Sequence, residues 1–254
     1  MVCFIGQGNL YKSNSDGKFE LMSNWKQGNG AVWSLTNVNG VLYVGTSTVN
    51  KKGNLYKINT NDINAKVEPV SNWKDTNGEV HVLVSTNNGD VYVGAKDTRG
   101  GKLYKINSSD QVTDLTNWTA TNGVALSILN VNGVIYIGTI TSNGNGRLYK
   151  SDTDDKFNPV SNWKDNNGEV HALANINGVA LSILNVNGVI YIGITNNSGE
   201  GKIYKSKADK SFELMLGWEN TNGAVWSLTN INDTIYIGTI APSNKGNLYI
   251  TEKK

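Results

Sequence analysis

Residues 31–45, AVWSLTNVNGVLYVG, predict a β-hairpin. β-forming residues fill both halves, and the Asn-Gly pair at 39–40 is a strong signal for a two-residue turn in which both central residues have positive φ. A third strand is expected at 54–58 and a fourth at 67–73, with Pro69 on the sheet edge, where its missing N–H costs no ladder bond. The unit is four antiparallel strands, called A to D.

A tryptophan marks each copy of this unit. The five copies are Trp25, Trp73, Trp118, Trp163 and Trp218. Successive copies lie 45 to 48 residues apart, except the last two, which are 55 apart. Four strands in about 45 residues, repeated along a chain, are typical of a β-propeller blade. We therefore predict an all-β fold, a β-propeller of four-stranded antiparallel blades. Five blades are expected because five D–A junctions exist, and six are the alternative because six tyrosines occupy the strand-C slot.

The repeats cover nearly the whole chain, so we expect a single domain over residues 1–254. The approximate repeats are 1–30, 31–78, 79–123, 124–168, 169–223 and 224–254. Repeat 169–223 carries a ten-residue insertion: residues 124–138 recur unchanged at 179–193, directly after another A-like segment at 169–178. This additional strand loops out, pairs elsewhere or marks a sequence rearrangement, and the sequence leaves the three possibilities open.

Charge and cysteine content narrow the function classes. The 23 Lys and Arg residues against 21 Asp and Glu give a net charge of +2, which argues against an electrostatically driven nucleic-acid or membrane partner. The single cysteine, Cys3, excludes an internal disulfide framework. No apolar stretch is long enough to span a bilayer. No signal peptide is visible at the N-terminus, so we expect a cytoplasmic protein or one exported by a non-standard route.

One face of the propeller is predicted to carry the ligand site. The B–C loops and the D–A junctions fall on the face where strand A begins, and loops on a rigid scaffold often bind ligands. The five repeated tryptophans, 25, 73, 118, 163 and 218, are candidate ligand contacts on this face. Packing between blades is the alternative role for each of them.

One slot on strand A varies from copy to copy. Its occupants are Trp33, His81, Leu126, His171 and Trp226. Closure at five blades would bring Trp33 beside Trp226, where two rings could stack on a sugar. The two histidines are candidate ligand contacts, but two His residues without cysteine are weak evidence for a metal site. We expect no metal and no cofactor.

The spaced order Asn-Gly, Leu-Tyr, Leu-Tyr-Lys, Asn-Trp resembles the five-bladed lectin propellers of the tachylectin type. This resemblance covers almost the whole chain and implies a multivalent carbohydrate binder with one pocket per blade junction. The turns at 11–19 and 150–157 resemble degenerate Asp-box hairpins, which implies only a turn role. Ligand residues do not transfer from the resemblance.

The resulting prediction is a non-catalytic, lectin- or adhesin-like module that binds a carbohydrate or glycoprotein. A protein-interaction scaffold is the alternative, and homo-oligomers are expected through surplus terminal strands. An enzyme is the least favoured class: Arg99 and Arg147 are the only arginines, too few for a sialidase-like cluster. Glu79 and Glu169, the best isolated carboxylates, lie two blades apart, whereas retaining glycoside hydrolysis needs carboxyl groups about 5 Å apart.

Overall fold

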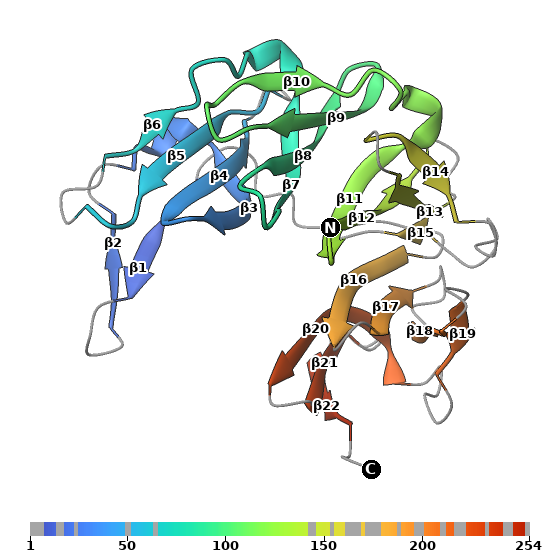
Figure 1. Cartoon of the computed structure of the whole chain (residues 1–254). Helices are drawn as coiled ribbons and strands as arrows, with labels where there is room; N and C mark the ends of the chain where they lie inside the picture. The colour runs from blue at the N-terminus through green and yellow to red at the C-terminus, as the bar shows by residue number, and fades with distance from the viewer. Residues whose placement is uncertain are drawn as a thin grey trace. The chain divides into compact units, whose positions relative to one another are not determined.

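The computed structural model describes most of the chain. The described residues are 8–13, 18–22, 25–48, 52–62, 66–141, 146–152, 155–160, 169–170, 179–186, 189–195, 201–208, 212–215, 222–231, 234–240 and 246–251. They form two compact units, Met1–Thr119 and Ala120–Lys254 (Figure 1).

The first unit contains three antiparallel sheets (Figure 1). The two-stranded sheet comprises β1 (Tyr11–Ser13) and β2 (Phe19–Leu21). The first four-stranded sheet comprises β3 (Ala31–Val38), β4 (Val41–Ser47), β5 (Leu55–Asn59) and β6 (Glu68–Pro69). The second comprises β7 (Glu79–Ser85), β8 (Val91–Asp97), β9 (Gly100–Ile106) and β10 (Val112–Asp114). Single turns of 3-10 helix, η1 (Gln27–Asn29) and η2 (Asp75–Asn77), precede β3 and β7.

The second unit begins with η3 (Ala120–Asn122) and repeats the pattern. Its first sheet comprises β11 (Val124–Val131), β12 (Val134–Ile140), β13 (Gly146–Ser151) and β14 (Phe157–Pro159). Its second comprises β15 (Glu169–Val170), β16 (Val179–Val186), β17 (Val189–Thr195), β18 (Gly201–Ser206) and β19 (Phe212–Leu214). Its third comprises β20 (Ala224–Ile231), β21 (Thr234–Ile240) and β22 (Gly246–Ile250).

The strand order confirms the predicted all-β propeller of four-stranded antiparallel blades. Strand A is β3, β7, β11, β16 and β20, and each pairs with the next strand as an A–B hairpin. Strand C is β1, β5, β9, β13, β18 and β22. Five A–B hairpins define five blades, which agrees with the preferred blade number. Among the described residues, no helix is long and apolar enough to cross a membrane.

The predicted turns and the edge proline are confirmed where the structure describes them. Asn39 and Gly40 have φ values of 49° and 82°, and Asn132 and Gly133 have 51° and 87°, as the type I′ hairpin requires. Pro69 lies on β6, at the sheet edge, opposite Tyr56. Strand D is shorter than expected: β6 covers two residues of the predicted 67–73.

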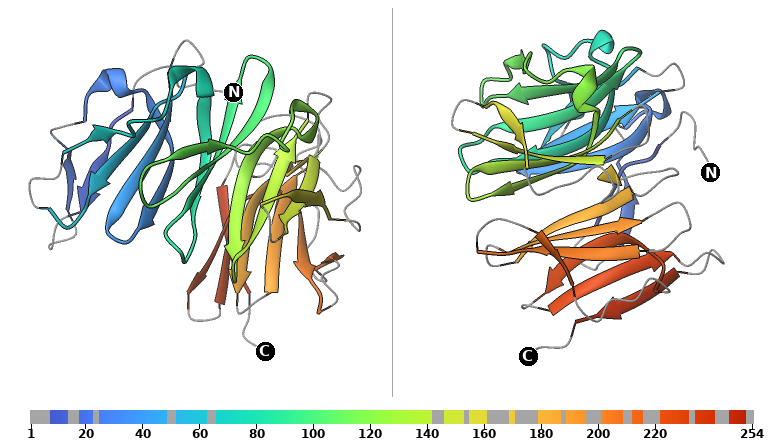
Figure 2. Two further views of the ribbon diagram at one scale, coloured as in Figure 1. Left: turned by 45° about the horizontal axis from the view of Figure 1, so that its top comes forward. Right: turned by 90° about the vertical axis from the view of Figure 1, so that its right-hand side faces the viewer.

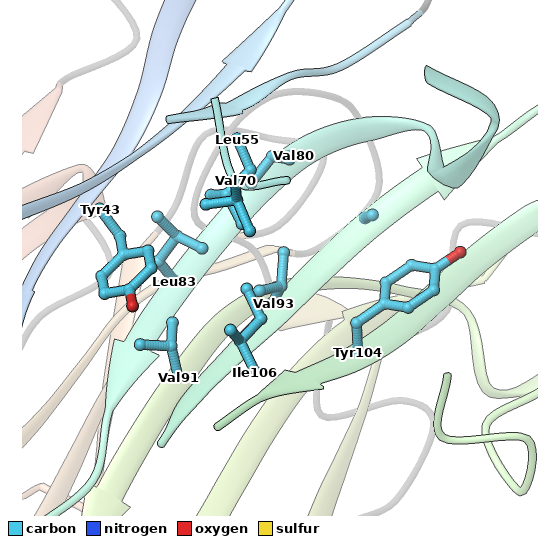
Figure 3. Close-up of a cluster of buried hydrophobic side chains, with 10 residues drawn as sticks. Tyr43, Leu55, Val70, Val80, Leu83, Val91, Val93, Tyr104 and Ile106 are labelled. Carbon is cyan, nitrogen blue, oxygen red and sulfur yellow. The ribbon is translucent and has the colours of Figure 1, made fainter. Parts of the chain in front are cut away.

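Neighbouring blades within a unit pack through strands A, B and C. In the first unit, Leu55 of β5 and Tyr43 of β4 lie in one buried cluster with Val80, Leu83 and Val93 of the following blade (Figure 3). The approach is so close that a Cβ on Gly45 of β4 would lie 2.3 Å from Val80 Cγ1. In the second unit, the sheets of β17 and β21 face each other in the same way (Figure 2).

The insertion in repeat 169–223 leaves the direction of its blade unchanged. β15 pairs parallel to β16, with Glu169 opposite Val179. The segment that continues the blade as strand A is β16, which then forms the usual antiparallel hairpin with β17. Of the three possibilities left open by the sequence, the structure shows pairing: the first two residues of the A-like segment form a short strand beside β16. Residues 171–178 lie outside the described residues.

Candidate functional site

Every strand A carries a β-bulge at the slot that varies in sequence. In β3 the register shifts between Val32 and Ser34, so Trp33 is the additional residue. The same shift places His81 on the bulge of β7 and Leu126 on that of β11. In β16 and β20 the bulged residues are Leu181 and Trp226. Bulges change the direction in which a side chain points and are frequent next to functional sites. The slot whose residue type varies between blades therefore lies at a position suited to a functional site.

In the first unit, two of these bulges meet at the junction between adjacent blades. The ring of Trp33 contacts the ring of His81 edge to face, with centroids 4.8 Å apart. Trp33 is half-buried, and the His81 side chain is 9% exposed. An indole with an accessible part beside an imidazole forms a wall on which a planar or ring-shaped ligand can stack.

A carboxylate is fixed beside this pair of rings. Ser47, at the end of β4, donates a hydrogen bond of 2.7 Å from Oγ to Oε1 of Glu79, the first residue of β7. Oε2 of the same carboxylate lies 3.7 Å from Nε2 of His81. Lys96 lies opposite Glu79 in the sheet. Ser47, Glu79, His81 and Trp33 together are called the junction cluster below.

Burial and hydrogen bonding shift the pKa of Glu79 in opposite directions. Burial raises the pKa of its carboxyl group, whereas the hydrogen bond from Ser47, the nearby imidazole of His81 and the charge of Lys96 lower it. The lowering effects win, so the pKa of Glu79 lies below its ordinary value of 4.5. The group is therefore a carboxylate at neutral pH, able to accept hydrogen bonds from hydroxyl groups or to act as a base.

Two glycines let the backbones of strands A and B approach each other, one in each blade that contributes to the junction cluster. Gly30, just before β3, has φ of 95°, and a Cβ there would lie 2.5 Å from the Ser47 carbonyl oxygen. Gly78, just before β7, has φ of 96° and would meet the Lys96 carbonyl oxygen at 2.3 Å. Because both positions need positive φ and have no room for a side chain, glycine is required at the start of these strands.

Two of the repeated tryptophans, Trp25 and Trp73, pack between adjacent blades of the first unit. Trp25 is 7% exposed, donates from Nε1 to the Gly8 carbonyl at 2.7 Å, and packs edge to face on Tyr56. Trp73 donates to the Gly53 carbonyl at 2.9 Å and packs on Tyr104. Trp118 is 2% exposed. The rings of Trp25 and Trp73 pack one blade against the next.

Several predicted site residues lie wholly or partly outside the described residues. Trp163, Trp218 and His171 lie outside the described residues, and of Trp226 only the backbone in β20 is described. The slot assigned to His171 belongs in the fourth blade to Leu181, because β16 rather than segment 169–178 is strand A. The exact recurrence of 124–138 at 179–193 was the signal that could have identified Leu181.

Sequence reasoning missed Ser47 and Lys96, because a residue that completes a site from a different strand has no motif of its own. Among the described residues, no group of three or more His, Cys, Asp or Glu side chains is placed to hold a metal ion. The chemistry available at the junction cluster is therefore that of a carboxylate, an imidazole, a hydroxyl group and an aromatic wall.

Comparison with known proteins identifies the fold and no family. No protein-family model matches the chain, and no curated protein matches it. Among solved structures, the chain is similar to a streptogramin B lyase (TM-score 0.58, 14% identity, 89% of this chain and 70% of that one). It is also similar to a candidate gluconolactonase (0.56, 9%, 96% and 82%) and to YjhT (0.55, 11%, 82% and 72%). At these identities the likeness shows a β-propeller fold alone.

These neighbours correct one prediction. The expectation that the chain is not an enzyme is wrong, because the solved structures similar to it include a lyase and a candidate gluconolactonase. The chain is a β-propeller protein with a polar and aromatic cluster at one blade junction. Its activity has to be argued from that cluster.

Proposed function

We propose that the chain binds a carbohydrate at the junction cluster. The observation that carries this proposal is the half-buried Trp33 at a β-bulge, in contact with His81, which in turn lies 3.7 Å from the hydrogen-bonded carboxylate of Glu79. The apolar face of a sugar ring stacks on an indole, while its hydroxyl groups donate hydrogen bonds to a carboxylate. The resemblance to tachylectin-type lectins supports the same ligand class.

The blade junctions are not equivalent in this proposal. The bulge slot holds an aromatic ring at Trp33 and Trp226 but leucine at Leu126 and Leu181. The junction cluster also uses Glu79 and Ser47, which the Leu126 slot does not match, since Val124 takes the place of Glu79 there. We therefore expect few binding sites per chain rather than five identical ones, a number that native mass spectrometry with the bound sugar counts directly.

Glycan-array screening tests the proposal, followed by calorimetry on the retained sugar with three variants. Trp33→Ala and Glu79→Gln should each weaken binding at least tenfold, and Trp33→Tyr should retain part of it because a stacking face remains. Leu35→Ala, on the same strand but 49% exposed, is the matched control and should bind as the unmodified chain does. Absence of any retained glycan, or binding unchanged in Trp33→Ala, contradicts the proposal. Protein capture that free sugars do not compete would favour the scaffold alternative.

An enzyme is the second candidate, and a specific contact favours it. Glu79 lies 3.7 Å from His81 and is oriented by Ser47, so a carboxylate and an imidazole are held beside each other. Such a pair can move a proton to and from a substrate. The two enzymes among the structural neighbours make a sugar lactone and a streptogramin B the first substrates to assay. Turnover that is lost in Glu79→Gln and in His81→Ala, but kept in Leu35→Ala, supports this candidate.

A further inference from the structure

Strand β22 exposes a leucine whose counterparts are buried in the other strands C. Leu248 is 68% exposed, and Ile250 two residues later is 58% exposed. The counterparts of Leu248, all 0–5% exposed, are Leu10, Leu55, Leu103, Leu148 and Ile203. An open edge strand with large aliphatic side chains is a ready template for association.

The hydrogen-bonding edge of β22 is open as well. In the other strands C, the carbonyl of the buried aliphatic residue accepts a bond of 2.7–2.9 Å from the backbone N–H that follows strand D. The donors are Met22, Val70, Leu115, Val160 and Met215. Within the described part of the chain, the sheet that contains Leu248 ends at β22, with no strand D beside it (Figure 1).

The repeat pattern shows which packing partner β22 lacks among the described elements. The aliphatic residue of strand C packs on the A–B hairpin that follows it: Leu55 lies in one cluster with Val80, and Leu10 in one with Val44. Among the described elements there are six strands C and five A–B hairpins. β1 already covers the first hairpin, so β22 is the strand C after which no hairpin stands among the described elements.

We propose that β22 of one copy of the chain takes the place of β1 in a second copy. β1 and the three residues before it share a four-residue segment with β22: Gly8-Asn9-Leu10-Tyr11 and Gly246-Asn247-Leu248-Tyr249. Leu248 thereby fills the site of Leu10, beside Trp25 and Val44.

The exchange also preserves two hydrogen bonds. The Met22 N–H, which now donates to the Leu10 carbonyl at 2.9 Å, donates to that of Leu248. The Trp25 indole N–H, now bonded to the Gly8 carbonyl at 2.7 Å, donates to that of Gly246. The carbonyl groups of Gly8 and Leu10 are thus replaced as acceptors by those of the identical residues Gly246 and Leu248.

β1 is the strand that can be displaced most readily. It forms a two-stranded sheet with β2, in which Tyr11 is 53% exposed and Leu21 is 52% exposed. A two-stranded sheet is marginally stable in water. Because the donor and acceptor surfaces differ, the association is head to tail and yields rings or longer chains. Neither Trp33 nor Glu79 takes part, so the exchange is independent of the ligand site.

A cysteine trap tests the register. β1 pairs Lys12 with Glu20, so β22 of the first copy is expected to pair Ile250 with Glu20 of the second. Cross-strand partners have Cα atoms about 4.5–5.5 Å apart, which suits a disulfide. Ile250→Cys and Glu20→Cys are placed on separate chains of different size, both in a Cys3→Ser background. The chains are mixed, incubated and oxidised, and a covalent heterodimer is expected on a non-reducing gel.

Glu213 supplies the matched control. Residues 212–215 repeat the Phe-Glu-Leu-Met of 19–22, but their strand β19 is paired with β18. Ile250→Cys mixed with Glu213→Cys should give at least fivefold less heterodimer than the pair with Glu20→Cys. Equal cross-linking of the two pairs, or none, overturns the proposal, as does a chain carrying both Ile250→Cys and Glu20→Cys that cross-links only within itself.

The mass of the unmodified chain gives an independent readout. Light scattering should show dimers or larger species that increase with protein concentration, and Leu248→Lys should shift them to monomer without lowering the melting temperature, since Leu248 is exposed in the single copy. Leu214→Lys, on β19 and 45% exposed, should leave the mass unchanged. A protein that is monomeric at every concentration, or oligomers that persist in Leu248→Lys, would overturn the exchange.

Discussion

Ser47 and Glu79 join two blades through a hydrogen bond of 2.7 Å, from the hydroxyl group at the end of β4 to the carboxylate at the start of β7. Both side chains are largely removed from solvent, with 7% of Ser47 and 15% of the Glu79 side chain exposed. A bond to a charged group at such a place contributes more than an ordinary surface bond. The contact therefore couples the candidate ligand site to the packing of the two blades.

Ser47→Ala should lower the free energy of unfolding by about 1.5–3 kcal/mol, because it leaves the Glu79 carboxylate with one partner fewer. It should also raise the pKa of Glu79, since the hydroxyl group is one of the groups that lower it. Urea unfolding measures the first effect, and an NMR pH titration of the glutamate side chains measures the second. Ser34→Ala, which removes the hydroxyl group that accepts a bond from the Leu83 N–H, is a control that should leave the Glu79 titration in place.

The carboxylate of Glu79 also makes the free energy of unfolding depend on pH. Because the pKa of Glu79 in the folded chain lies below its ordinary value of 4.5, the ionised group stabilises the fold above pH 4.5. This contribution is lost as the pH falls through the lowered pKa. Glu79→Gln should therefore show a smaller loss of unfolding free energy than the unmodified chain between pH 5 and the acid limit, about pH 2. Parallel pH profiles for the two proteins would refute this expectation.

Gly45→Val should destabilise the first unit, because a Cβ at this position lies 2.3 Å from Val80 Cγ1 across the blade junction. Overpacking of this kind costs about 1–3 kcal/mol, measured by thermal or urea unfolding. Gly28→Ala is the matched control, since a Cβ there meets nothing within 4 Å. Equal stability losses in the two variants would show that glycine content, and not the close approach, is responsible.

The sequence predicts the parts of this fold that repeat, because each repeat contains its own local signals. The Asn-Gly pair at 39–40 determines its hairpin through positive φ at two adjacent residues, and the strand over 31–38 follows from its β-forming residues. The junction cluster is different. That Trp33 and His81 are bulged, and that Ser47 reaches Glu79, depends on register between strands and between blades. No pattern within one strand contains that information.

The same limit explains why the pairing of the A-like segment stayed open and why two predictions, the slot of His171 and the exclusion of enzymes, were wrong. The parallel pairing of β15 with β16 depends on contacts between strands, and His171 was assigned to a slot that the sheet gives to Leu181. The exclusion of enzymes rested on missing arginines and on the separation of Glu79 from Glu169. Those observations argue against particular glycosidase chemistries, and they do not cover a carboxylate and an imidazole on one strand such as Glu79 and His81.

Trp73→Phe separates the two roles of a junction tryptophan. The phenyl ring keeps much of the contact with Tyr104 but loses the hydrogen bond of 2.9 Å to the Gly53 carbonyl, so the cost should be about 1–2 kcal/mol. Trp73→Ala loses the packing as well and should cost about 3–5 kcal/mol. Urea unfolding ranks the variants. If Trp73 contacted ligand instead of wedging the blades, Trp73→Ala would weaken glycan binding while leaving stability nearly intact.

Tyr43 gives a prediction at alkaline pH. Burial raises the pKa of Tyr43 from 10.0 to about 12, and the charge of Asp110 and the hydrogen bond of 3.1 Å to it add to this rise. Lys57 pairs with the same carboxylate, so Asp110 joins the two blades. Since the folded pKa exceeds the unfolded value, neutral Tyr43 stabilises the chain fully below pH 10, and this contribution is lost as the pH rises through about 12. Asp110→Asn removes the charge but keeps the burial, so the pKa of Tyr43 should fall part of the way towards 10. Tyrosinate absorbance, with Tyr43→Phe used to assign the signal, measures the shift, and an unchanged pKa in Asp110→Asn would mean that burial alone sets it.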